Sequence, residues 1–215
     1  MTRPSRNVDR LLLSAGRELF PETGVAQLSV RKVAIRAGVN AGMFHYHFGS
    51  KDLFVRQLLQ ELYDEMFANL ELAARAPLPG DALRAALNVL GRFARDNARL
   101  LRRLIADALS GDPLAREFLR ANMPRHVGVL LGLIKSGQRT GVLRAMAPPH
   151  ALAFLAGSVA APILIGGTLA DHDLVPGVAV GLPALIATDA AIAERVDCAL
   201  AGLAKKRARV PKRKK

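Results

Sequence analysis

Hydrophobic residues recur every three to four positions along most of the chain, which is the spacing that lines one face of an α-helix. The first such series consists of Val8, Leu11, Leu12, Ala15, Leu19 and Phe20. Gly24 follows shortly afterwards, and glycine readily takes the left-handed conformation that ends a helix. The pattern therefore predicts an amphipathic helix that ends near Gly24.

Three further helices are predicted in the first third of the chain. Ser29 is a good N-cap for the second helix. The inward positions of that helix are Val30, Val33, Ala34 and Ala37. Gly38 breaks it, and Asn40 can cap a third, short helix over roughly residues 41–47. Gly49 ends the third helix, and Ser50 then caps a long fourth helix, whose apolar stripe includes Leu53, Phe54, Leu58, Leu62, Met66 and Leu70.

The rest of the chain also has helical spacing. After "APLPGD" at residues 76–81, helical segments are predicted near residues 81–110, 113–138, 148–169 and 183–203. No convincing strand pattern and no internal repeat is found, so the predicted fold class is all-α.

Charge is distributed unevenly over the 215 residues, whose formal net charge is +13. Residues 1–55 have eight Lys and Arg against four Asp and Glu, whereas residues 56–204 are nearly neutral. Residues 205–215 contain eight basic side chains and no acidic one. Basic segments on a neutral body indicate a polyanionic partner, either nucleic acid or an anionic membrane surface. We expect the tail to be disordered, because Val210 is its only sizeable apolar side chain.

Cysteine content and hydropathy bear on the compartment. Cys198 is the only cysteine, which excludes intramolecular disulfides and cysteine-built zinc sites and favours a reducing, cytoplasmic location. The N-terminus has no apolar segment of the signal-peptide type. Residues 145–170 lack charged side chains and are long enough to span a bilayer, but they contain prolines and glycines and are rich in alanine. We favour the alternative that this segment lies in a core or a subunit interface, and expect no membrane partner.

Residues 29–47 combine a helix, a tight turn at "AGVN" and a second helix. This is the helix-turn-helix arrangement, which lays its second helix in the major groove of DNA. The stretch Glu18–Phe54, "ELFPETGVAQLSVRKVAIRAGVNAGMFHYHFGSKDLF", resembles the TetR family of bacterial transcriptional regulators. The family pattern is a helix ending in phenylalanine and glycine, a serine- or threonine-capped helix, "AGV", a short aromatic helix and "F-x-S-K-x-x-L".

The resemblance implies both a fold and a function. It implies an N-terminal three-helix DNA-binding domain (1–54), joined by a long helix to a helical effector-binding and dimerisation domain (55–204), with the basic tail at 205–215. The function implied is that of a ligand-responsive, sequence-specific transcriptional regulator, by family default a repressor. A homodimer would place its two helix-turn-helix units, here called reading heads (residues 29–47 of each chain), in successive major grooves of a pseudo-palindromic operator, roughly 34–36 Å apart.

The residues expected to contact DNA lie at the starts of the second and fourth helices and along the third. Asparagine can bond adenine edges, small or apolar side chains can meet a thymine methyl group, and Arg31 is placed for a phosphate or a guanine. Lys51 opposes the dipole of its own helix, so a nearby phosphate explains it better than helix stability does. The set is Ser29, Arg31, Asn40, Ala41, Met43, His45, Tyr46, His47 and Lys51.

Two assignments within this set stay open. The family usually has a tyrosine that reaches the DNA backbone at the position of His45, and this chain has its tyrosine one residue later, at Tyr46. His45 and His47 also form an H-x-H pair, but two imidazoles alone are a weak metal ligand set. We expect no metal and no cofactor. Phe44 and Phe48, four residues apart, are expected to be core.

The segments 148–170 and 182–203 are too apolar to face water together, which favours a subunit interface. Small residues there would permit close helix approach: Ala153, Ala156, Gly157, Ala160 and Ala161. An effector pocket is expected between the middle helices, for an unidentified small apolar or amphipathic molecule, although apolar stripes of this kind are also typical of plain core. Its candidate residues are Phe67, Phe93, Leu104, Phe118, Met123, His126, Leu130 and Phe154.

Two other classes of protein are alternatives to a sequence-specific regulator. An enzyme is not expected, because the sequence lacks G-x-S-x-G, a P-loop, a dinucleotide-binding glycine fingerprint and H-E-x-x-H. The alternative is a nonspecific DNA-binding protein that relies on its basic tail. Such a tail either adds phosphate contacts or only keeps the protein soluble.

Overall fold

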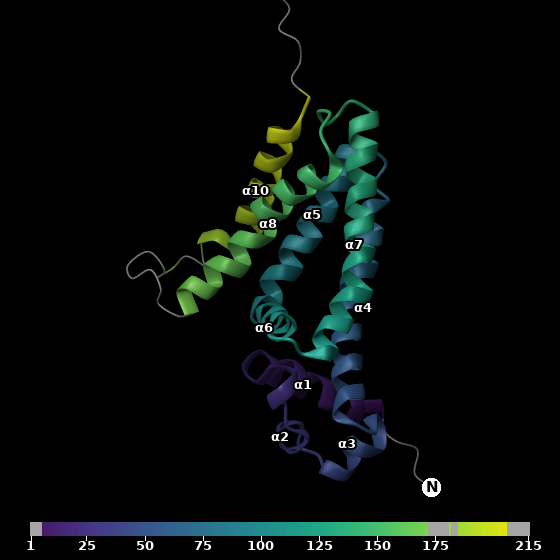
Figure 1. The fold of residues 1–215 in the computed structure, drawn as a ribbon, viewed down its shortest axis with the longest axis vertical. Coiled ribbons are helices and arrows are strands. Elements are labelled where there is room, and N and C mark those ends of the chain that lie inside the picture. The colour runs from purple at the N-terminus through teal and green to yellow at the C-terminus, as the bar shows by residue number, and fades with distance from the viewer. Residues whose placement is uncertain (1–5, 172–180, 182–184, 206–215) are drawn as a thin grey trace, which may run out of the picture. The chain divides into compact units, whose positions relative to one another are not determined.

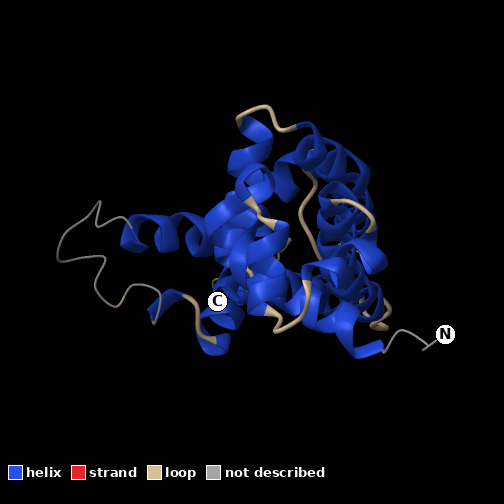
Figure 2. Cartoon of the chain, turned by 90° about the horizontal axis from the view of Figure 1, so that it is seen from below, coloured by secondary structure: helices blue, strands red, loops and turns tan. Residues whose placement is uncertain are grey.

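The computed structural model describes residues 6–171, 181 and 185–205. The described part is built from α-helices and contains no β-strand, which confirms the all-α prediction (Figures 1 and 2). In chain order the helices are α1 (Arg6–Gln27), α2 (Val30–Arg36), α3 (Ala41–Phe48), α4 (Lys51–Ala74), α5 (Pro79–Asp96), α6 (Ala98–Leu109), α7 (Pro113–Arg139), α8 (Pro148–Asp171) and α10 (Asp189–Leu203).

The segment that was expected to be helical near residues 81–110 is divided at Asn97 into α5 and α6. Asn97 lies outside helical geometry, with φ −120° and ψ 18°, and its side-chain Nδ2 donates to the Phe93 carbonyl at 3.0 Å. The Asn97 backbone N–H donates to the same carbonyl at 3.1 Å, so both donors of Asn97 close the end of α5 there. The short α6 that results packs against α1.

By packing, the chain groups into two compact units. The N-terminal unit comprises Met1–Asn69 and Phe93–His126, and the C-terminal unit comprises Leu70–Arg92 and Val127–Lys215. The N-terminal unit thus contains α6 and the first half of α7 as well as the helix-turn-helix. The division into functional domains at residues 54/55 is a separate matter and stays a prediction.

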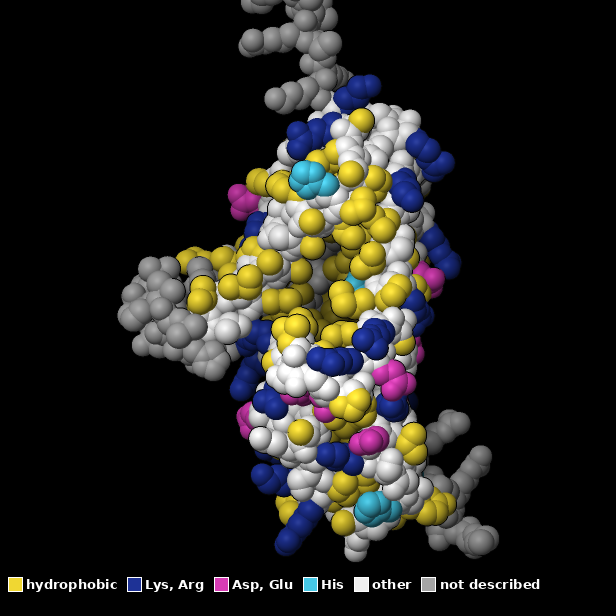
Figure 3. Space-filling model, viewed as in Figure 1, with side chains coloured by type: hydrophobic (Ala, Val, Ile, Leu, Met, Phe, Trp, Pro, Cys, Tyr) yellow, Lys and Arg dark blue, Asp and Glu magenta, His cyan; other side chains and the backbone are white. Residues whose placement is uncertain are grey.

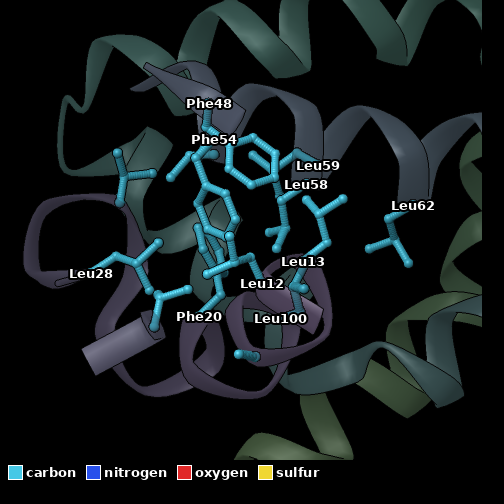
Figure 4. Close-up of a cluster of buried hydrophobic side chains, with 14 of the residues drawn as sticks. Leu12, Leu13, Phe20, Leu28, Phe48, Phe54, Leu58, Leu59, Leu62 and Leu100 are labelled. Carbon is cyan, nitrogen blue, oxygen red and sulfur yellow. The ribbon is translucent and has the colours of Figure 1, made fainter. Parts of the chain in front are cut away.

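A single hydrophobic core holds the N-terminal unit together. Side chains of α1, α3, α4 and α6 converge in it, with Phe54 completely buried (Figure 4). The ring of Phe54 lies 4.9 Å from that of Phe44 and 4.8 Å from that of Phe48, measured between centroids. Gly16 allows α1 to approach α4 here, because a Cβ at this position would lie 2.6 Å from Leu58 Cδ1. The prediction that Phe44 and Phe48 are core residues is confirmed.

The core of the C-terminal unit is formed where α8 packs against α10. One face of each helix is buried, and the residues involved are Ala151, Leu155, Val159, Ile163, Ile192, Val196, Leu200 and Leu203. Gly91 of α5 brings a third helix close, since a Cβ there would lie 2.6 Å from Ile192 Cγ2.

Candidate nucleic-acid interface

Caps and two left-handed glycines define the helix-turn-helix. Ser29 Oγ accepts from the Lys32 N–H at the start of α2, at 3.4 Å, and Asn40 Oδ1 accepts from the Gly42 N–H at the start of α3, at 2.7 Å. Gly38, in the turn between the helices, has φ +68°, and Gly49, at the end of α3, has φ +70°. The residues that cap and break these helices are therefore those that the sequence predicted.

Burial separates the two faces of α3. Phe44 and Phe48 point into the core of the N-terminal unit, whereas Asn40, Ala41, His45 and Tyr46 are exposed. Of the remaining residues expected to contact DNA, Arg31 at the start of α2 is exposed, whereas Ser29, Met43, His47 and Lys51 are half-buried. Side chains of the types that read base edges and phosphates are thus available on one helix and at its borders.

His45 and Tyr46 differ in how far their polar atoms are already engaged. His45 Nδ1 lies 3.1 Å from the Gly49 carbonyl, where the ring helps to close the C-terminus of α3. Tyr46 is 66% exposed, and its hydroxyl makes no hydrogen bond to the described part of the chain. Its ring meets that of His47 edge-on, with the centroids 5.4 Å apart.

Lys51 has partners within the protein that the sequence did not suggest. Its Nζ donates to the carbonyl oxygens of Val25 and Ala26, both at 3.1 Å. These carbonyls lie at the end of α1, so the ammonium joins α4 to α1. An ammonium has three donors, and these two bonds leave one for a phosphate.

The H-x-H pair has no further metal ligand beside it. In the described ranges, no cluster of three or more His, Cys, Asp or Glu side chains has the proximity that a metal site requires.

The eight candidate effector residues fall in different environments. Leu104 and Leu130 are buried, Met123 and Phe154 are exposed, and Phe67, Phe93, Phe118 and His126 are half-buried. A surface groove of about 650 Å³ runs between α4 and α7 of the N-terminal unit, with His47, Phe48, Leu53 and Asn122 among its lining. Phe118 alone of the eight lines this groove.

In a polar cluster between α4 and α7, the sequence indicated Phe67 and His126 but not Tyr63, Asn122 and Arg125. The Tyr63 hydroxyl donates to the Asn122 carbonyl at 2.7 Å and lies 3.4 Å from His126 Nδ1. The Arg125 guanidinium sits 4.1 Å from the centroid of the Phe67 ring. Burial lowers the pKa of His126 and raises that of Tyr63, which favours the neutral form of each side chain. The four-residue spacing of Tyr63 and Phe67 and of Asn122 and His126 was the available signal.

These features define the chain as a helix-turn-helix DNA-binding protein. The family model for bacterial regulatory proteins of the tetR family matches residues 12–58. The HTH-type transcriptional repressor Rv3405c of Mycobacterium tuberculosis (strain ATCC 25618 / H37Rv) is 32% identical over 162 residues, which cover 75% of this chain and 77% of the relative. The HTH-type transcriptional regulator RutR of Escherichia coli (strain K12) is 23% identical over 141 residues, 66% of each chain. The chain belongs to the TetR family of transcriptional regulators.

Solved structures agree with the fold. HlyIIR, a hemolysin II transcriptional regulator, superimposes with a TM-score of 0.63 at 20% identity, covering 93% of this chain and 98% of the other. FadR from Bacillus subtilis, in complex with stearoyl-CoA, superimposes with a TM-score of 0.65 at 16% identity, covering 90% and 98%. At these identities the likeness concerns the fold alone.

Proposed function

We propose that the protein is a ligand-responsive repressor that binds a pseudo-palindromic operator as a homodimer and is released by a small apolar or amphipathic effector. The observation that carries the DNA-binding part is the division of α3 into a buried phenylalanine face and an exposed face with Asn40, Ala41, His45 and Tyr46. The chain acts in the cytoplasm, where its operator is accessible, and we assign it no catalytic role.

Tyr46 is the side chain that we assign to the DNA backbone. Its exposed, unbonded hydroxyl can donate to a phosphate, whereas one nitrogen of His45 is already taken by the Gly49 carbonyl. Arg31 and Ser29 at the N-terminus of α2, and the third N–H of Lys51, supply further phosphate contacts. Asn40, Ala41, Met43 and His47 remain for base edges and the groove rim.

The proposal of a homodimer is supported by the face of α8 that the C-terminal unit leaves uncovered. Within the described residues, α8 is the one helix long and apolar enough to cross a membrane by length and composition, and 22% of its most apolar window is buried. Ala153, Phe154, Ala156, Gly157 and Ile165 are exposed on it, and hydrophobic side chains are visible along it in Figure 3. A second copy of this helix would cover small and apolar residues of this kind closely.

The effector part of the proposal is supported by the aromatic residues beside the polar cluster of α4 and α7. Half-buried rings at Phe67 and Phe118 suit an apolar chain, and Tyr63, His126 and Arg125 suit a polar group attached to it. FadR, of similar fold, was solved with stearoyl-CoA, which makes that amphipathic molecule a first probe.

Selection of bound sequences from random duplexes tests the DNA-binding proposal. A sequence-specific dimer enriches an inverted repeat whose half-sites lie one helical turn apart, about 10 base pairs. A protein that coats DNA through its tail, the alternative function, enriches no sequence.

A further inference from the structure

The last turn of α1, which follows the kink at Gly24 and leads into α2, is bonded to side chains from two other helices. The N–H of Val25 donates to Asp107 Oδ2 of α6 at 2.8 Å, and this bond is buried. The carbonyls of Val25 and Ala26 accept from Lys51 of α4. Ser29, the N-cap of α2, follows only three residues later. Both backbone polar groups of Val25 are therefore bonded to side chains, its N–H to Asp107 and its carbonyl to Lys51. These two bonds constrain the direction in which the chain enters the helix-turn-helix.

Asp107 is an unusual residue for its position. It is only 8% exposed, on a helix whose neighbours Leu100 and Leu104 lie in the core. A carboxylate buried here must be paired to be tolerated. Arg103, one turn earlier on α6, lies with its Nε 2.9 Å from Asp107 Oδ1. The other carboxylate oxygen, Oδ2, accepts from the Val25 N–H. Arg103 thus offsets the charge of the buried carboxylate, and Oδ2 is left to make one charge-assisted hydrogen bond.

Gly24 shows that the backbone is adapted to this contact. It has φ 62° and ψ −164°, a conformation essentially restricted to glycine. A Cβ at this position would collide with Asp107 Oδ2 and with the Arg103 guanidinium, whose Nη2 would be 2.7 Å away. The end of α1 thus approaches α6 as closely as a backbone without a side chain allows.

We propose that Asp107 is a positioning residue for DNA reading. It touches no DNA, and through the Val25 N–H it sets the angle at which α2 and α3 leave α1. The position of α6 then becomes part of what determines operator affinity. This inference rests on the proposed reading of DNA by α3.

The test compares Asp107→Ala with Leu100→Ala in the full-length protein. Both variants remove a buried side chain of α6, but only the first removes a bond to the last turn of α1. Three quantities are measured: melting temperature, hydrogen exchange at the Val25 amide, and affinity for the duplex selected from random sequences. Asp107→Asn is the conservative variant, because it keeps an acceptor oxygen at the same place.

Asp107→Ala is expected to speed exchange at Val25 at least tenfold and to weaken DNA binding about tenfold. The slope of log affinity against log salt should not change, because the side chains that meet phosphate are all still present. Asp107→Asn should restore most of the affinity. Leu100→Ala should lower the melting temperature with less than a twofold change in affinity.

Two results would overturn the inference. One is native exchange and affinity in Asp107→Ala. The other is an equal loss of affinity in Leu100→Ala, which would make Asp107 an ordinary stabilising residue. Tyr46→Phe distinguishes failure of the proposed DNA contact from failure of the positioning role. If Tyr46→Phe also leaves DNA affinity unchanged, the proposed DNA contact fails. If Tyr46→Phe weakens DNA binding while Asp107→Ala binds normally, only the positioning role fails.

Discussion

The two tyrosines of the chain, Tyr46 and Tyr63, occupy opposite environments. Tyr46 on α3 is 66% exposed, whereas Tyr63 on α4 is 6% exposed and bonded to the Asn122 carbonyl. The same hydroxyl group is therefore free to bind a partner at one position and stabilises the fold at the other. The spacing of Phe44 and Phe48 predicted that Tyr46 faces outward, whereas nothing in the local sequence indicated the bond made by Tyr63.

Removal of each hydroxyl should give contrasting results. Tyr46→Phe should weaken operator binding by about 1 kcal/mol per half-site, through the lost bond to phosphate, with an unchanged melting temperature. Tyr63→Phe should cost about 1 kcal/mol of unfolding free energy, because the Asn122 carbonyl loses a partner, and should leave DNA affinity unaltered. Fluorescence anisotropy with labelled operator and urea unfolding give the two quantities. An unchanged affinity in Tyr46→Phe would contradict the assigned contact.

Burial of His126 has a consequence for pH dependence. Its pKa in the folded state lies below its ordinary value near 6.5, because burial disfavours the imidazolium. Neutral His126 therefore leaves the free energy of unfolding at its full value above pH 6.5. Below that pH the unfolded chain binds the proton more readily, so the free energy of unfolding decreases as the pH falls through the folded-state pKa. His126→Gln should flatten the decline of melting temperature between about pH 7.5 and pH 5. The exposed His150, changed to Gln, is the control and should leave that decline as it is.

At the scale of elements, the reading head depends on glycine conformation at its turns. Gly38 has φ +68°, and a Cβ on it would meet no atom within 4 Å. Gly132 in α7 also has open space around a Cβ, but it lies within a helix. The two glycines thus differ in backbone conformation and not in available room.

Alanine should therefore have opposite effects at these two positions. Gly38→Ala should destabilise the protein by about 1–2 kcal/mol, the cost of a left-handed L-residue. Gly132→Ala should stabilise it by about 0.5–1 kcal/mol, because alanine loses less backbone entropy in a helix. Gly38→Asn should cost less than Gly38→Ala, because asparagine tolerates this region. Urea denaturation measures all three, and a loss at Gly132 equal to that at Gly38 would show that conformation is not the cause.

At the scale of the whole molecule, α8 combines an apolar composition with a largely exposed surface. Gly157 lies on this face, and a Cβ added to it would have no atom within 4 Å, so a larger residue would not disturb the fold of one chain. It would, however, meet a second chain packed there. The position therefore tests assembly without testing folding.

Gly157→Glu should yield a monomer in light-scattering measurements. Its operator affinity should fall more than about tenfold, because the second reading head loses the effective concentration that dimerisation provides. Gly132→Glu places the same charge on α7 at an equally open site and should remain dimeric. A dimeric Gly157→Glu would remove α8 from the interface.

The basic tail is the second feature at this scale, and residues 206–215 lie outside the described residues. Truncation after Lys205 should flatten the dependence of log affinity on log salt, by about 0.9 for each phosphate that the tail no longer neutralises. Affinities measured from about 50 to 200 mM salt give the slope. An unchanged slope would leave the tail a solubilising segment.

The sequence by itself determined the helices of the reading head and their inward faces. Ser29, Gly38, Asn40 and Gly49 act through neighbours a few residues away, and the spacing of Phe44 and Phe48 defines one side of a helix. Such signals are local, so they can be read from a single chain without knowledge of what packs against it.

Only the tertiary structure decided which polar groups meet across the fold. Asp107 and Val25 are 82 positions apart, Tyr63 and Asn122 are 59 apart, and Lys51 reaches carbonyls 25 and 26 positions earlier. No periodicity relates such residues, because their proximity follows from how α1, α4, α6 and α7 pack. A hydrogen bond requires its donor and acceptor within about 3 Å, and that condition is met or missed by packing alone.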